Sequence, residues 1–129
     1  MQFVKMHGIG NDYVYVDAIS DRSVLERFDL AELSRVVSDR HTGIGSDGLI
    51  LLCPAEKGMQ ADLRMRMFNA DGSESEMCGN GIRCVCKLAH DDGLVTANPM
   101  RIQTGGGVLS LAYMLDKEGK VAQVTVDMG

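Results

Sequence analysis

The sequence lacks several features that would direct it to particular classes of protein. It has no tryptophan, no apolar run of membrane-spanning length, and no apolar stretch at the N-terminus like that of a secretory signal. It also lacks an excess of positive charge, because 13 Lys and Arg residues stand against 18 Asp and Glu residues and leave a net charge of −5. These absences argue against a nucleic-acid-binding surface and a membrane span. They predict one cytoplasmic globular domain in 129 residues.

Cysteine is present, but not in a pattern that indicates a metal site or a disulfide framework. The four cysteines stand at positions 53, 78, 84 and 86, and the spacing Cys78-x5-Cys84-x-Cys86 matches no common zinc motif. Reduced thiols are expected in a chain without a secretory signal. We therefore expect no bound metal. The nine methionines indicate an adaptable core and identify no cofactor site.

Apolar and alternating segments predict seven strands, and helical periodicity predicts two helices. In the first helix, Leu30, Leu33, Val36 and Val37 form one apolar stripe. The second helix is apolar around most of its circumference, which is typical of a buried helix. Together these elements predict an α+β fold in which a mixed, strongly curved, barrel-like β-sheet wraps around a central helix. The expected strands are Gln2–Met6, Tyr13–Ile19, Leu49–Cys53, Ala61–Asn69, Met100–Thr104, Val108–Leu115 and Val121–Met128, and the expected helices are Leu30–Ser38 and Gly81–Asp91.

Three loops combine glycine with Asn or Asp, at Gly8–Asp12, Gly43–Gly48 and Asn69–Asn80. Each loop by itself is typical of an ordinary turn. A dinucleotide-binding motif is rejected for the first loop because the third glycine is missing. It is rejected for the second because the Gly-x-Gly-x-x-Gly run follows a helix and leads into a strand, the reverse of the required context.

The segment Asn69–Cys86 carries the strongest chemical signal. Cys78 stands just before the second predicted helix and is followed by Gly79, Asn80 and Gly81. The N–H groups at a helix start lack intrahelical partners, so they attract a carboxylate and lower the pKa of a nearby thiol. Two interpretations fit: a buried cysteine in a capping turn, or a thiolate that removes and returns a proton on carbon. A protease is less favoured, because the sequence places no histidine beside Cys78.

These motifs resemble, in order, those of the N-terminal half of the diaminopimelate epimerases. Residues 77–84, Met-Cys-Gly-Asn-Gly-Ile-Arg-Cys, are similar to the Cys-Gly-Asn-Gly-x-Arg-Cys signature of that family. The related proline racemases carry histidine at the position of Asn80, and the phenazine-biosynthesis relatives share the fold but usually lack the cysteine. The other similar segments are Met6–Asp12, Arg40–Asp47, Phe68–Glu74 and Val126–Gly129.

The resemblance implies a cofactor-independent isomerase whose two similar halves enclose the substrate. One cysteine from each half faces one side of the Cα, so one thiolate removes the α-proton and the other thiol returns a proton. This chemistry interconverts LL- and meso-diaminopimelate in lysine and peptidoglycan precursor synthesis. The motif match assigns Cys78 as one base, Gly79 and Asn80 as backbone N–H donors to the α-carboxylate, and Asn11 and Asn69 as contacts to the distal end of the substrate.

The resemblance also implies that residues 1–129 are one half of such an enzyme. The second half is the expected partner, and without its cysteine this half is expected to have little or no epimerase activity. The resemblance assigns no base among Cys53, Cys84 and Cys86, and all three are expected in the core. Some members carry glutamine at the position of Gly48, where this chain can offer only backbone contact. Three alternatives stay open: a non-catalytic domain for binding amino acid carboxylates or for assembly, a different amino acid racemase of this fold, and a homodimer of two such halves.

Overall fold

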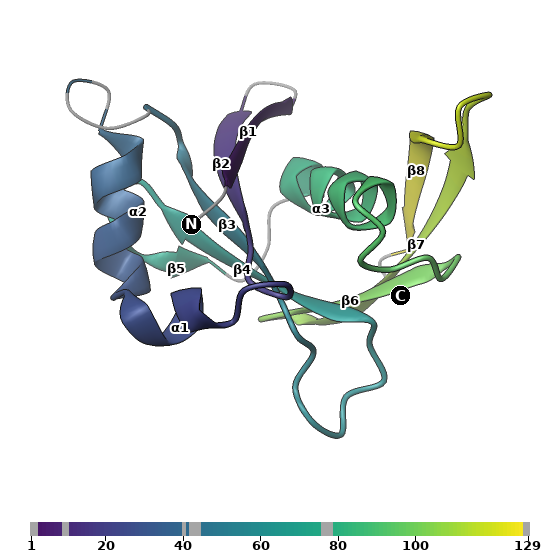
Figure 1. Ribbon diagram of the computed structural model, residues 1–129, viewed down its shortest axis with the longest axis horizontal. Coiled ribbons are helices and arrows are strands. Elements are labelled where there is room, and N and C mark those ends of the chain that lie inside the picture. Colours follow the sequence, from purple (N-terminus) through teal and green to yellow (C-terminus); the bar gives the residue numbers. More distant parts are fainter. Residues whose placement is uncertain (1–2, 9–10, 40, 42–44, 76–78, 128–129) are drawn as a thin grey trace.

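The computed structural model describes residues 3–8, 11–39, 41, 45–75 and 79–127 (Figure 1). Within these ranges the chain forms eight strands and three helices. The strands are β1 (Phe3–Gly8), β2 (Asn11–Asp17), β3 (Gly48–Cys53), β4 (Leu63–Asn69), β5 (Glu74–Ser75), β6 (Met100–Thr104), β7 (Gly107–Leu115) and β8 (Val121–Asp127), and the helices are α1 (Ser23–Arg27), α2 (Leu30–Ser38) and α3 (Gly79–Asp91).

All described strands belong to one mixed sheet in the order β1-β2-β3-β4-β6-β7-β8, with β5 paired to β4. The β2–β3 and β4–β6 pairs are parallel, and the other pairs are antiparallel. Figure 1 shows this sheet curling around α3, so that β1 and β2 stand on one side of the helix and β7 and β8 on the other. The expected α+β fold, a curved mixed sheet around a central helix, is confirmed.

The central strands carry helices on both faces. Tyr13 and Tyr15 of β2 pack with α3, whereas Val14 and Val16 of the same strand pack with α1 and α2. Successive side chains along a strand point to opposite faces of the sheet, so a strand that is covered on both faces has a continuous run of apolar residues. This explains β3, in which all six residues from Gly48 to Cys53 are buried.

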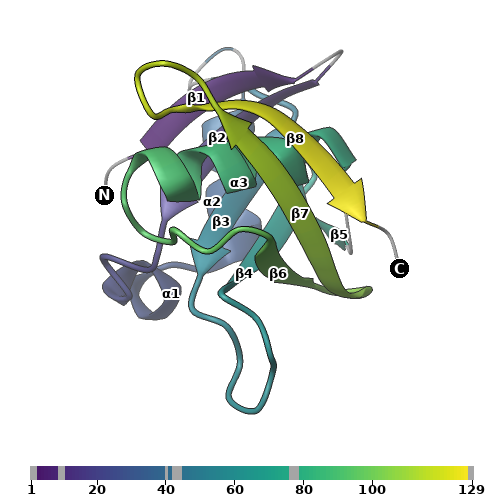
Figure 2. The same ribbon diagram turned by 90° about the vertical axis from the view of Figure 1, so that its right-hand side faces the viewer.

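Helix α3 is the centre of the fold. Its side chains at Ile82, Val85, Cys86 and Ala89 are fully buried, and the helix contacts β1, β2, β3 and β8. Figure 2 shows β7 and β8 passing over one side of the helix, with β1 and β2 behind it. Because a helix surrounded by sheet on several sides has little surface left for solvent, its apolar circumference is the expected consequence.

The structure corrects several details of the expected elements. Helix α3 begins at Gly79, two residues before the expected Gly81, and both α1 and β5 were missed. Helix α2 has the expected bounds, but its buried face differs. The expected apolar stripe included Val36, which is 54% exposed, and the buried face instead includes Ser34 and Ser38. The reason is that these serines bond to polar groups of the neighbouring strands and loop, described below.

Two of the cysteines expected in the core lie there. Cys53 and Cys86 are buried and Cys84 is partly buried, each with a free thiol. Burial raises the pKa of both Cys53 and Cys86 to about 11, so neither is ionised near neutral pH. Within the described ranges, no helix is both long and apolar enough to cross a membrane.

Candidate functional site

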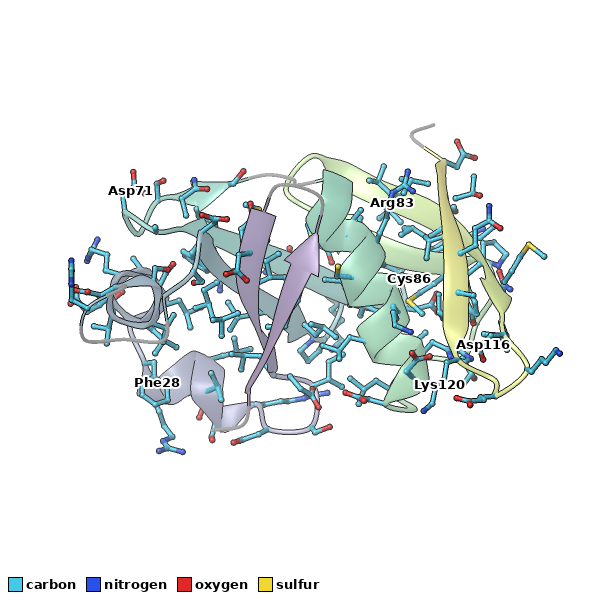
Figure 3. All side chains as sticks on the ribbon, turned by 90° about the horizontal axis from the view of Figure 1, so that it is seen from above. Phe28, Asp71, Arg83, Cys86, Asp116 and Lys120 are labelled. Atoms are coloured by element: carbon cyan, nitrogen blue, oxygen red, sulfur yellow. The ribbon has the colours of Figure 1, made fainter. Side chains whose placement is uncertain are left out.

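The sheet topology brings the strand ends that flank the three glycine-rich loops to the same end of the molecule. Strands β1 and β4 end there, while β2 and β3 begin there, because β2 and β3 are parallel to one another and antiparallel to their outer neighbours. Helix α3 also begins at this end, which lies to the right in Figure 2 and at the top in Figure 3. We call this end the site edge; it is defined by Gly8, Asn11, Gly48, Asn69 and Gly79, the terminal residues of these five elements.

The first turn of α3 has the properties expected of an anion site. Gly79 and Asn80 are its first two residues, so their backbone N–H groups lack acceptors within the helix. The first turn contains no acidic side chain, which would compete for the same groups. Cys78, the predicted base, lies outside the described residues, so its place relative to this turn stays a prediction.

Asn69, the last residue of β4, sits in a tightly bonded turn. Its backbone N–H donates to the Ser73 carbonyl at 2.8 Å, and its own carbonyl accepts from the Gly72 N–H at 2.9 Å. The side-chain Nδ2 of Asn69 donates to Ser73 Oγ at 3.0 Å, and Ser73 Oγ donates to Asp71 Oδ1 at 2.6 Å. The position and direction of the Asn69 amide are therefore determined by the turn that follows it.

Helix α2 supports this turn from behind. The hydroxyl of Ser34, fully buried, donates to the Asn69 carbonyl at 2.7 Å. Arg35 Nη1 donates to the Asp71 carbonyl at 3.2 Å. Gly72 has φ +90°, and a Cβ there would collide with Arg35 Nη1 and lie 2.9 Å from the Ala31 carbonyl. The turn therefore requires glycine at position 72 for two reasons, its left-handed backbone and its close approach to α2.

On the other side of β3, two reciprocal hydrogen bonds between Asp12 and Asp47 hold the start of β2. The Asp12 N–H donates to Asp47 Oδ2 at 2.7 Å, and the Asp47 N–H donates to the Asp12 carbonyl at 2.6 Å. Asn11, the first residue of β2, is the neighbour of Asp12. The sequence pointed to this loop through its glycines but did not indicate a role for Asp47, and it likewise missed Ser34.

Gly48 joins the two asparagine-bearing strands at the site edge. It pairs with Tyr13 on β2 and with Asn69 on β4, so this row of three strands spans about 10 Å. A Cβ at Gly48 would collide with the Phe68 carbonyl oxygen. With these strand positions there is no room for a larger residue at Gly48, and backbone contact of Gly48 with a substrate stays a prediction.

The polar stripe of α3 bonds to the last strand. Lys87 Nζ donates to the Val121 carbonyl at 2.8 Å and forms an ion pair with Asp91 Oδ2 at 2.8 Å. The Val121 N–H donates to Asp91 Oδ1 at 3.0 Å, and Arg83 Nη1 donates to the Val124 carbonyl at 3.2 Å. Burial opposes ionisation of Asp91. The hydrogen bonds from Lys87, the Val121 N–H and His90 outweigh it and lower the pKa of Asp91 to about 2.

The family model described as diaminopimelate epimerase matches residues 3–129. The chain belongs to the diaminopimelate epimerase family. The diaminopimelate epimerase of Agathobacter rectalis is 54% identical over 129 residues, and that of Methanococcus maripaludis is 52% identical over 129 residues. Each alignment covers 100% of this chain, but only 42% and 44% of the respective relative. The chain thus spans less than half the length of the diaminopimelate epimerase family members that it matches.

Solved structures of more distant proteins share the fold. A hydroxyproline epimerase from Agrobacterium vitis, with bound trans-4-hydroxy-L-proline, superposes with a TM-score of 0.68 at 18% identity, over 96% of this chain and 40% of that one. A Bacillus anthracis phenazine biosynthesis protein of the PhzF family gives a TM-score of 0.60 at 20% identity, over 92% of this chain and 36% of that one. These likenesses agree with the expected fold.

Proposed function

We propose that this chain is one half of a diaminopimelate epimerase and supplies one of its two cysteine bases. The thiolate of Cys78 removes the α-proton of the substrate and becomes a thiol, leaving the electron pair of the C–H bond on Cα. A thiol of the second half then delivers its proton to the opposite face of Cα and becomes a thiolate. The reaction inverts the α-carbon, balances in protons and charge, and needs no cofactor.

The arrangement of the site edge is the observation that carries this proposal. The N–H groups of Gly79 and Asn80, which have no acceptor within the helix, lie at the same end of the sheet as Asn11 and Asn69. A carboxylate at the start of α3 would hold Cα beside Cys78. The rest of the substrate would then extend toward the strand ends, where Asn11 and Asn69 would bind the distal amino acid group. A diamino dicarboxylic acid needs both anchor points.

The start of α3 also supports the chemistry of deprotonation. Removing the α-proton moves negative charge from Cα into the carboxylate, and donors already aimed at that carboxylate stabilise the added charge. The same end of the helix lowers the pKa of a thiol beside it, and this increases the thiolate fraction of Cys78. One helix terminus thus stabilises the base before the proton transfer and the carbanion after it.

We propose that the partner of this chain is a second, similar half, which completes the cleft and adds the second cysteine. The relatives are more than twice as long as the matched chain, which supports this proposal. With one base in place, this half alone would bind diaminopimelate weakly and invert it slowly or not at all.

The test is α-deuterium incorporation into LL-diaminopimelate in D2O, followed by mass spectrometry and NMR. It uses this chain alone and this chain joined to the second half of a family member. We expect exchange in the joined protein, its loss by at least 1000-fold in Cys78→Ser, and near wild-type exchange in Cys84→Ser. Cys84 is a suitable control because it is a partly buried thiol of the same helix, away from its first turn.

Full exchange in a folded Cys78→Ser protein would overturn the assignment of the base. Binding of diaminopimelate without any α-proton exchange in the joined protein would instead favour a non-catalytic carboxylate-binding domain. If the isolated chain exchanges the proton, sedimentation velocity will show whether two copies pair to supply both bases.

A further inference from the structure

We propose that Asp47 is a positioning residue that sets the selectivity of the site for the distal end of the substrate, through its hold on Asn11. This inference rests on the proposed function, because it takes Asn11 as the contact to that distal end. Asp47 does not take part in the proton transfer.

The hydrogen bonds of Asp47 fit this role. Its backbone N–H donates to the Asp12 carbonyl at 2.6 Å, and its Oδ2 accepts the Asp12 N–H at 2.7 Å. The side chain thus takes the place of a backbone carbonyl, and the β2–β3 pairing extends one residue beyond its first rung at Tyr13 and Gly48. A hydrogen bond accepted by a carboxylate is also stronger than one accepted by a neutral carbonyl.

Asp47 is itself held by the rigid part of the fold. The Gly45 N–H donates to the Val37 carbonyl at 3.0 Å, and the Ser46 N–H donates to the Ser38 carbonyl at 3.3 Å. Ser46 Oγ donates to the Gly48 carbonyl at 3.0 Å and lies 3.3 Å from Ser38 Oγ. The segment before Asp47 is therefore fastened to the last turn of α2 and to the start of β3. Through its two hydrogen bonds to Asp12, Asp47 connects this fastened segment to β2.

The end of the β1–β2 hairpin needs such support. β1 is an edge strand of the sheet, so lateral hydrogen bonds to this hairpin come from the β3 side. Asn11 is at the last rung of that hairpin, paired with Gly8, and its neighbour Asp12 is the residue that Asp47 binds. Without the Asp47 carboxylate, the first residues of β2 would shift relative to β3, and a shift of about 1 Å is enough to weaken a positioned contact strongly.

The experiment measures selectivity by titrating the 15N-labelled chain, joined to the second half of a family member as in the exchange test, with two ligands, meso-diaminopimelate and 2-aminopimelate. The second ligand has the same length but lacks the distal amino group. We expect the wild-type chain to prefer diaminopimelate, Asp47→Ala to lose about tenfold of that preference, and Asp47→Asn to keep it, because the amide oxygen still accepts the Asp12 N–H. The Asn11 side-chain amide resonance should shift on binding in the wild type and in Asp47→Asn only.

Asp116→Ala is the matched control. Asp116 Oδ1 also accepts backbone N–H groups, from Glu118 at 2.9 Å and Lys120 at 3.0 Å. It lies in the β7–β8 turn, and Figure 3 shows it at the end of the molecule opposite Asp71, which is in the turn after Asn69. Unchanged selectivity in a folded Asp47→Ala chain, equal loss in Asp116→Ala, or equal loss in Asp47→Asn would each overturn the positioning role. A wild-type chain that binds both ligands equally would instead overturn the proposed distal contact of Asn11.

Discussion

Several small residues hold the candidate site in place, and they do so by backbone contacts. Ser34 and Asp47 bond to backbone groups at the ends of β4 and β2, and Gly72 lets the turn after Asn69 approach α2. Such residues have no chemistry of their own in the reaction. Their effect is to reduce the freedom of the strand ends that carry Asn11 and Asn69, so substitutions there should act on binding through geometry.

The substitution Gly72→Ala tests this at one position. We expect it to lower the free energy of unfolding by about 2–3 kcal/mol, because alanine is strained at φ +90° and its Cβ collides with Arg35 and the Ala31 carbonyl. Gly58→Ala is the control, since Gly58 has φ +87° with nothing within 4 Å of a Cβ, and should cost about 1 kcal/mol. Urea denaturation measures both. Equal costs would show that the approach to α2 does not matter.

At the scale of elements, α3 contacts the apolar core with one set of residues and the backbone of β8 with another. Its apolar residues fill the interior of the curved sheet, while Arg83, Lys87 and Asp91 bond to the backbone of β8. Charged side chains that cover strand backbone also reduce the risk of unwanted strand pairing at a sheet edge. The helix is therefore held in a defined rotation, which determines where its first turn points.

The hydrogen bond between Asp91 of α3 and Val121 of β8 should make the free energy of unfolding depend on pH in the acid range. The pKa of Asp91 is about 2 in the folded chain, below the ordinary value of 3.8, so folding favours the ionised carboxylate. Its contribution is fully present above about pH 4 and is lost as the pH falls toward 2. Between pH 4 and pH 2, the free energy of unfolding of the wild type should fall by about 1–2 kcal/mol more than that of Asp91→Asn.

Urea titrations at several pH values in that window check this expectation. Asp92→Asn changes charge at the next, exposed position and should leave the wild-type pH dependence unchanged. Parallel pH curves for the wild type and Asp91→Asn would contradict the proposed bonding of Asp91.

For the whole molecule, the shared sheet couples two apolar clusters. Leu49 and Leu51 face the α1–α2 cluster, Ile50 and Leu52 face the α3 cluster, and all four side chains are fully buried. If β3 left the sheet, the apolar side chains of both clusters would become exposed to solvent. The chain should therefore unfold as one cooperative unit, although its helices lie on opposite faces of the sheet.

Leu51→Ala and Leu52→Ala test this coupling. Each should lower the free energy of unfolding by about 2–5 kcal/mol, because each leaves a cavity in a buried cluster. Tyrosine fluorescence reports on the α3 cluster, which holds all three tyrosines, Tyr13, Tyr15 and Tyr113, and far-UV circular dichroism reports on the whole chain. We expect the two signals to change together in both variants. Separate transitions would show that the clusters unfold independently.

Much of this architecture could be predicted because the local patterns are strong. The apolar run at β3, the Asp29 cap of α2, whose side chain accepts the Glu32 N–H, and the apolar circumference of α3 each reflect short-range physics. The two-residue strand β5 and the short helix α1 were missed because neither has a periodic pattern long enough to detect. Val36 was assigned to the wrong face of α2, because apolar character alone cannot show which polar residues find buried partners.

By itself, the sequence determined the element types, the buried central helix and the family, because hydrophobic periodicity and ordered motifs are local properties of the chain. Only the tertiary structure decided that the strand ends flanking three separate loops meet at one edge, that Asp47 reaches Asp12 over 35 positions, and that Ser34 reaches Asn69 over the same separation. These contacts depend on strand order and on parallel or antiparallel pairing. Both are set by the free energy of the whole packed sheet, which no local segment encodes.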